Sequence, residues 1–222
     1  MDGLVAALCQ AIINKIEYTY RMSTAENQMP RITLFEAQPT DIEGLHIITM
    51  KQIEDERGVI RELFRDSALR DAGLTGFGPW KQINATETSQ GAIRGLHAEE
   101  MWKLVAVVEG EAYGAYVDVR PDSPSRGKVV STPLTKGMQV LVPQGVCNGF
   151  QSVSEGVMQY LYCFDAEWVL GMKGHSVNPL DPELGIDWPI PVEASNTDLI
   201  SCKDASAPTP KETLGQTAIQ ST

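Results

Sequence analysis

The stretch Lys103–Arg120 has the sequence KLVAVVEGEAYGAYVDVR, two apolar runs of strand length that meet at Gly110. Similar runs recur between about residues 44 and 165, separated by turn residues at intervals of roughly 8 to 12 positions, which is typical of an all-β sandwich or barrel. Inside this region only SALRDAGL (67–74) has a convincing helical pattern, which Gly73 is expected to end. The sequence therefore predicts an all-β domain with a few short helices. The other strand-like runs are GLHIITMK (44–51), VIRELF (59–64), FGPWKQINAT (77–86), AIRGLH (92–97), GMQVLVP (137–143) and VMQYLYCF (157–164).

The length and composition bound the number of domains. With 222 residues, of which 42% are hydrophobic and 21% charged, the chain can bury a substantial core, most simply as one domain. We expect this domain to span residues 31–210. Residues 1–30 are expected to be an N-terminal extension, either helical or disordered, and residues 211–222 a flexible polar tail. The helical alternative for the extension depends on apolar residues at helical spacing, namely Leu4, Val5, Leu8, Ile12, Ile13 and Ile16.

Charge and cysteine content exclude several classes of protein. Lys and Arg number 18 against 29 Asp and Glu, a net charge of −11 that disfavours nucleic-acid binding and means that a phosphate-bearing ligand would need local arginines. The four cysteines, at 9, 147, 163 and 202, form no CxxC pair, which favours a reducing cytoplasm over a disulfide scaffold or a structural zinc site. No apolar run approaches the ~20 residues that a membrane span needs. We therefore expect a cytoplasmic protein that does not bind membranes.

Strand parity identifies a lysine in an unusual position. Alternate residues of a strand point to opposite faces, so Lys103 shares its face with Val105 and Val107. A lysine on an apolar face is costly unless it is paired or lies at the mouth of a pocket. By the same parity Tyr162 shares a face with two other aromatic residues and could be plain core. Each of these residues taken alone is more often structural than functional, and only convergence on one cavity would favour a functional role.

Histidine is scarce, and only His97 has a setting that suggests chemistry. His46 and His175 have no companion at metal-ligand spacing, and a structural role is expected for each. A metal-binding cupin barrel would need about three histidines and a glutamate, but the first half-motif here is His97-Ala98-Glu99 and the second has Asn148 at the histidine position. A cupin iron, manganese or zinc site is therefore not expected. His97 is left free for proton transfer, which the ordinary histidine pKa near ~6.5 suits.

Several blocks of sequence, in order, resemble the dTDP-4-dehydrorhamnose 3,5-epimerase family. Any one block is weakly diagnostic, whereas DERG, RGLH, VDVR followed by SP, and DPELGIDWP in this order are hard to obtain by chance. The resemblance covers most of residues 44–208. The blocks are EDERGVIRELF (54–64), QINATETSQGAIRGLH (82–97), KLVAVVEGEAYGAYVDVR (103–120), LVPQGVCNGF (141–150), QYLYCF (159–164), LDPELGIDWP (180–189) and CKDASAP (202–208).

The resemblance implies a fold and a mechanism. The implied fold is a jelly-roll cupin barrel without metal or cofactor, and members of the family are usually homodimers. They act on a nucleotide-linked 4-keto-6-deoxyhexose in deoxysugar or polysaccharide synthesis. The C4 carbonyl acidifies the protons on C3 and C5, so a base can form an enolate and an acid can return a proton to the opposite face. The family's base corresponds to His97 and its orienting carboxylate to Asp204. Tyr162 corresponds to the acid on the far face, and Lys103 to the group that stabilises the enolate oxygen.

The resemblance also implies substrate-binding residues. Arg57 and Arg94 match the arginines that bind the diphosphate, a task for which the planar guanidinium is suited. The alternative for both is a surface salt bridge. Glu62 matches a position near the base of the nucleotide, and Gln82 and Asn84 match polar residues that line the sugar pocket.

Some positions depart from the family pattern. Asn148 replaces a histidine and can bind substrate through hydrogen bonds but cannot relay a proton. The segment AEEMW (98–102) is shorter than usual and lacks the customary Gln after the base and Gly before the lysine. Cys163 replaces a common lysine, and Glu167 and Trp168 replace a tyrosine pair. These differences lie where sugar specificity would be set.

Three functions therefore stay open on sequence grounds. The first is a 3,5-epimerase of a nucleotide 4-keto-6-deoxy sugar. The second is an epimerase that inverts only C3 or C5, or that uses another nucleotide sugar. The third is a non-catalytic cupin that binds sugar nucleotides, which the joint presence of His97, Lys103, Tyr162 and Asp204 disfavours. A metal-dependent oxygenase ranks last because the ligands are missing.

Overall fold

The computed structural model describes residues 10–15 and 29–219, and these fall into two compact units. The described residues of the first unit lie within 1–32 and 53–60. Residues 10–15 are helical. A three-stranded sheet with the order β1-β4-β5 is formed by β1 (Arg31–Thr33), β4 (Gln52–Asp55) and β5 (Gly58–Arg61), most of which belong to this unit. Most of the predicted N-terminal extension, residues 1–9 and 16–28, lies outside the described residues.

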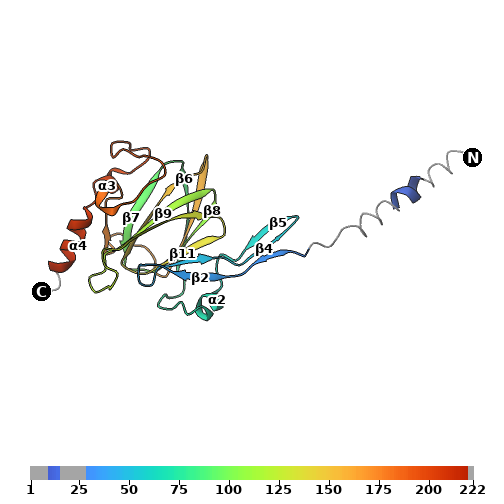
Figure 1. Cartoon of the computed structure of the whole chain (residues 1–222), viewed down its shortest axis with the longest axis horizontal. Helices are drawn as coiled ribbons and strands as arrows, with labels where there is room; N and C mark the ends of the chain where they lie inside the picture. Colours follow the sequence, from blue (N-terminus) through green and yellow to red (C-terminus); the bar gives the residue numbers. More distant parts are fainter. Residues whose placement is uncertain (1–9, 16–28, 220–222) are drawn as a thin grey trace, which may run out of the picture. The chain divides into compact units, whose positions relative to one another are not determined.

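The second unit, residues 33–52 and 61–222, contains two antiparallel sheets (Figure 1). The six-stranded sheet has the order β2 (Glu36–Pro39), β3 (His46–Thr49), β11 (Met138–Val142), β8 (Lys103–Glu109), β13 (Val157–Phe164), β6 (Gln82–Ser89). The five-stranded sheet has the order β10 (Val129–Thr135), β9 (Glu111–Asp118), β12 (Val146–Ser152), β7 (Ile93–Glu99), β14 (Gly174–Ser176). The predicted all-β class with few short helices is confirmed.

The core lies between the two sheets. Val105 and Val107 from β8 pack in one cluster with Tyr116 from β9 and with Phe150 from β12, all of them buried. Burial of side chains of this size is worth roughly 1.5–3 kcal/mol each. Lys103 lies on the same strand face as these valines and is also buried, which confirms the parity prediction. The fold therefore encloses an ammonium group at one end of its apolar core.

The predicted helix 67–74 is present as α2 (Asp66–Asp71). Gly73 follows it with φ +79°, the left-handed conformation that glycine adopts without strain, so the predicted stop is confirmed. A short 3-10 helix, η1 (Pro182–Leu184), lies in the proline-rich segment.

Two helices follow near the C-terminus, and the first approaches β7 (Figure 1). This helix, α3 (Cys202–Ala205), starts at Ser201, whose hydroxyl accepts a hydrogen bond from the Asp204 amide at 3.1 Å. The second helix, α4 (Pro210–Ile219), occupies the stretch that the sequence predicts to be a flexible tail. Its first turn is closed by a capping box, since Thr209 Oγ1 accepts from the Glu212 amide and the Glu212 carboxylate accepts from the Thr209 amide.

Candidate active site

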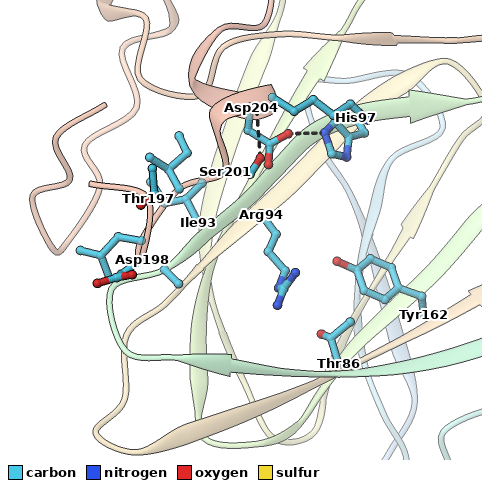
Figure 2. A pocket seen from close by; sticks show the side chains of 13 residues that line it. Thr86, Ile93, Arg94, His97, Tyr162, Thr197, Asp198, Ser201 and Asp204 are labelled. Carbon is cyan, nitrogen blue, oxygen red and sulfur yellow. Dashed lines mark hydrogen bonds and ion pairs between the residues drawn. The ribbon is translucent and has the colours of Figure 1, made fainter. Parts of the chain in front are cut away.

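A cavity of about 460 Å³ in the second unit collects most of the predicted catalytic residues (Figure 2). Strand β7 from the five-stranded sheet contributes one wall, strands β6 and β13 from the six-stranded sheet contribute another, and the segment before and within α3 covers a third side. The lining residues are Thr86, Ala92, Ile93, Arg94, His97, Tyr162, Thr197, Asp198, Leu199, Ile200, Ser201, Lys203 and Asp204.

His97 and Asp204 form a hydrogen-bonded pair at the edge of this cavity. The His97 Nε2 atom lies 2.7 Å from Asp204 Oδ1, and the Asp204 side chain is only 8% exposed. Burial raises the pKa of Asp204, but the hydrogen bond from His97 and the amide of Gly95 outweigh it and hold that pKa below the ordinary value. An ionised carboxylate only accepts, so Nε2 carries the hydrogen and Nδ1 of the neutral ring is the basic nitrogen.

Tyr162 projects into the same cavity from the opposite sheet (Figure 2). Its ring packs edge-on against Tyr160, with 5.0 Å between centroids, and stacks on Phe164 at 5.6 Å. Burial raises the pKa of the Tyr162 phenol above its ordinary value, against the opposing effect of the Arg94 guanidinium. The hydroxyl therefore keeps its proton at neutral pH and can act as an acid.

Arg94 provides positive charge on the cavity wall. Its Nε donates to Thr88 Oγ1 at 3.0 Å and its terminal nitrogen donates to the Glu87 carbonyl at 3.4 Å. Within the described part of the chain Arg94 forms no ion pair, so the surface salt bridge considered from the sequence is not found there. Lys203, an exposed residue that sequence reasoning passed over, lines the same cavity. Its position beside Asp204 in the KDA block was the signal that could have identified it.

Lys103 is not among the residues that line the cavity; it lies behind His97 in the barrel. The side chain is 5% exposed, and its ammonium forms an ion pair with Glu99. The Lys103 Nζ atom also donates to Asn148 Oδ1 at 2.6 Å and to the His97 carbonyl at 3.1 Å. Asn148 itself pairs with His97 across strands β12 and β7. Two predicted site residues, Lys103 and Asn148, are thus brought together directly beneath the predicted base.

The remaining predicted binding residues lie elsewhere. Arg57 belongs to the first unit, where its exposed guanidinium pairs with Asp55 at 2.5 Å. Glu62 pairs with Arg65, and this guanidinium lowers the pKa of the Glu62 carboxyl. The Arg57 ion pair is the surface salt bridge that the sequence offered as its alternative, and the nucleotide-binding roles of Arg57 and Glu62 stay predictions.

Gln82 and Asn84 lie on β6, the strand next to the one that carries Tyr162. Asn84 pairs with Tyr162 in the ladder between the two strands. The amide of Gln82 donates to Asn84 Oδ1 at 3.1 Å, and its carbonyl accepts from the Trp168 amide at 2.7 Å. Asn84 therefore lies opposite Tyr162 in the sheet and Gln82 lies opposite Phe164, although neither Gln82 nor Asn84 lines the cavity itself.

The described residues, 10–15 and 29–219, contain neither a metal-ligating cluster nor a helix that could span a membrane. In these ranges no group of three His, Cys, Asp or Glu side chains is placed to hold a metal ion. No helix in the same ranges is long and apolar enough to cross a membrane.

Comparisons with known proteins identify relatives of this chain. The family model described as dTDP-4-dehydrorhamnose 3,5-epimerase matches residues 39–212. The chain is 33% identical to a dTDP-4-dehydro-6-deoxyglucose 3-epimerase from Streptomyces bikiniensis, over 77% of this chain and 87% of the relative. It is also 33% identical to a dTDP-4-dehydrorhamnose 3,5-epimerase from Sinorhizobium fredii, again over 77% and 87%.

A solved structure extends the comparison to the fold. The epimerase of Legionella pneumophila Philadelphia 1, in complex with dTDP-4-keto-L-rhamnose, superposes with a TM-score of 0.70 at 31% identity. The match covers 80% of this chain and 94% of that structure. The predicted jelly-roll cupin barrel is thereby confirmed.

Proposed function

Because the chain belongs to the dTDP-4-dehydrorhamnose 3,5-epimerase family, we propose that it epimerises a dTDP-linked 4-keto-6-deoxyhexose at C3, C5 or both. The observation that carries this proposal is the placement of a base and an acid on opposite walls of one cavity. His97, oriented by Asp204, comes from the five-stranded sheet, and Tyr162 comes from the six-stranded sheet. Inversion at carbon needs this arrangement, since the proton must leave one face and return to the other.

The reaction starts at His97. Nδ1 removes a proton from the carbon next to the C4 carbonyl, and the electron pair of that C–H bond moves into the carbonyl to give an enolate. The negative charge of Asp204 stabilises the imidazolium that forms and keeps the ring in place. Tyr162 then donates its phenolic proton to the opposite face of the same carbon. Exchange with water returns the proton to Tyr162 and removes the proton from His97, so no proton is gained or lost overall.

The nucleotide diphosphate is assigned to the cationic part of the cavity. Arg94 lies on the strand that carries His97, and Lys203 lies in α3 beside Asp204, so both add positive charge to the lining of the cavity. In a chain with a net charge of −11, such local charge is what a phosphate ligand requires. The roles of Arg57 and Glu62 toward the nucleotide, of Gln82 and Asn84 toward the sugar, and of Asn148 toward substrate are proposals that rest on the resemblance.

Proton NMR in D₂O tests the function directly. The purified protein is incubated with dTDP-4-keto-6-deoxyglucose, and deuterium uptake is scored separately at C3 and C5 for the wild type and for His97→Ala. Uptake that falls by roughly 10²–10⁴-fold in His97→Ala supports the proposed base, because this is the usual effect of removing a general base. Uptake at one carbon alone selects a single-centre epimerase.

Binding without any uptake would contradict the proposal. If the wild type binds dTDP yet exchanges neither proton, and a panel of other nucleotide 4-keto sugars gives the same result, the chain is a binding protein rather than an epimerase.

We also propose that the protein is a homodimer of the cytoplasm. The dimer rests on family resemblance, and sedimentation velocity tests it through a molar mass of twice 24.3 kDa. The cytoplasmic location is supported by the three described cysteines, Cys147, Cys163 and Cys202, all of which are free.

A further inference from the structure

The buried lysine behind the base is surrounded by oxygen atoms. Lys103 Nζ lies 2.6 Å from Asn148 Oδ1 and 3.1 Å from the carbonyl oxygen of His97, and it forms an ion pair with the Glu99 carboxylate. We call Glu99, Lys103 and Asn148 the Lys103 cluster. An ammonium has three N–H groups and no acceptor; it donates to Asn148 and to the His97 carbonyl, and the Glu99 carboxylate lies against it as its counter-ion.

Because the Lys103 ammonium is buried, it needs the Glu99 carboxylate to balance its charge. The Lys103 and Glu99 side chains are 5% and 22% exposed, and Asn148 is 4% exposed. Of the three oxygen partners, only Glu99 carries a charge that balances the ammonium. Removing one member of a buried ion pair leaves the other uncompensated, which is far more costly than breaking a surface pair. The position of the Lys103 ammonium therefore depends on Glu99.

The cluster is also joined to the main chain of the base. Lys103 donates to the carbonyl of His97, and Asn148, which holds the same ammonium, is the residue that pairs with His97 across the sheet. Asp204 fixes the ring of His97 from the other side. His97 is thus held at two points, its imidazole by Asp204 and its backbone by Lys103.

We propose that Glu99 is a positioning residue for proton transfer, acting on His97 through the Lys103 ammonium. This inference rests on the proposed function. Glu99 fixes the ammonium, and the ammonium fixes the main-chain carbonyl of the base. A small displacement of a catalytic group lowers the rate strongly, by up to about 10²-fold for 1 Å. Loss of the Glu99 carboxylate therefore lowers kcat while leaving substrate affinity nearly unchanged, because Glu99 acts without touching the substrate.

Two substitutions at Glu99 and one matched control test the proposal. Glu99→Ala removes the carboxylate and its oxygens, whereas Glu99→Gln keeps an acceptor oxygen and removes only the charge. Glu100→Gln makes the same chemical change at the exposed neighbouring residue. We expect kcat to fall by about ten- to hundredfold in Glu99→Ala. A smaller fall is expected in Glu99→Gln and none in Glu100→Gln, with KM within threefold of the wild type throughout.

Melting temperatures measured for the same variants separate catalysis from folding, and Glu99→Gln serves if Glu99→Ala does not fold. A kcat within twofold of the wild type in both folded Glu99 variants would overturn the inference. A raised KM with unchanged kcat would also overturn it, since Glu99 would then bind the substrate itself.

A double-variant cycle and a spectrum without substrate complete the test. If Glu99 acts through Lys103, then Glu99→Ala lowers kcat in the wild type but adds almost nothing to Lys103→Met; additive losses would contradict the inference. In lysine ¹⁵Nζ NMR of the free protein, the enclosed Lys103 ammonium gives a slowly exchanging signal that Glu99→Gln weakens. An unaffected signal would overturn the inference about Glu99 but not the proposed function. A wild type that exchanges no sugar proton would overturn the proposed function.

Discussion

Replacing Asp204 by Asn tests the part of the site that makes His97 a base. The amide is nearly the same size as the carboxylate, so the packing of α3 against β7 is kept and only the charge is lost. The imidazolium that forms during proton transfer is stabilised by the carboxylate 2.7 Å from its Nε2. Two unit charges with centres about 4 Å apart interact by ~4 kcal/mol at an effective dielectric constant of about 20.

This energy sets an upper limit on the effect. Since 1.36 kcal/mol corresponds to tenfold in rate, ~4 kcal/mol corresponds to a loss of ~10³-fold in kcat. The amide dipole retains part of the interaction, so we expect Asp204→Asn to lose about 10²- to 10³-fold, less than His97→Ala. The assay is the rate of deuterium incorporation into the sugar in D₂O at saturating substrate.

The control is Asp198→Asn, which changes another carboxylate of the same cavity wall that has no described contact with His97. We expect its rate within threefold of the wild type. If Asp204→Asn also stays within threefold, Asp204 does not tune the base, and the assignment of the basic nitrogen to Nδ1 loses its support.

Three further predictions concern the acid, the diphosphate and the stability of the fold. Tyr162→Phe should still exchange the sugar proton with D₂O but yield little inverted product in the NMR assay, because the acid on the far face is gone; inversion at the wild-type rate would exclude Tyr162. Arg94→Ala should raise KM in a salt-dependent way with kcat nearly constant, as steady-state kinetics at two ionic strengths would show. Although burial raises the pKa of Asp118, hydrogen bonds from Arg120, Ser123 and Ser125 lower it to about 2. This stabilisation, ~2 kcal/mol, is fully present above the unfolded-state pKa near ~3.9 and is lost as the pH falls toward 2. Urea unfolding should show Asp118→Asn less stable at pH 7 and the difference vanishing near pH 2.

The sequence predicted the strands whose apolar residues form clear runs, and it predicted Lys103 as an anomaly from parity alone. It did not predict β10 or β12. Strand β10 carries Pro133, which the edge position of the strand tolerates. Strand β12 is buried throughout, yet it contains Asn148 and Gln151, so it lacks the apolar pattern of a central strand. The amide of Gln151 is satisfied by the carbonyls of Gly91 and Ile190, partners that only the folded chain provides.

Some features of the candidate site could likewise be predicted from the sequence, and others could not. No periodicity could pair His97 with Asp204, which are 107 residues apart, and only the resemblance placed them together. The surface salt bridge considered from the sequence for Arg57 is made with Asp55, two residues away, and Glu62 pairs with Arg65, three residues away. Such short-range ion pairs compete with ligand binding in any charged segment. Helix α4 was not predicted because its residues from 211 onward were assigned to a polar tail, and the capping pair of Thr209 and Glu212 was not recognised as a helix start.

We propose that the number of inverted carbons is set by how the sugar can turn between His97 and Tyr162. The 3-epimerase from Streptomyces bikiniensis and the 3,5-epimerase from Sinorhizobium fredii are each 33% identical to this chain. C3 and C5 lie on either side of the C4 carbonyl, so the same base can reach the second proton only after the ring has moved. Deuterium at both carbons would therefore report a sugar that turns between His97 and Tyr162, and deuterium at one carbon a sugar held in a single orientation.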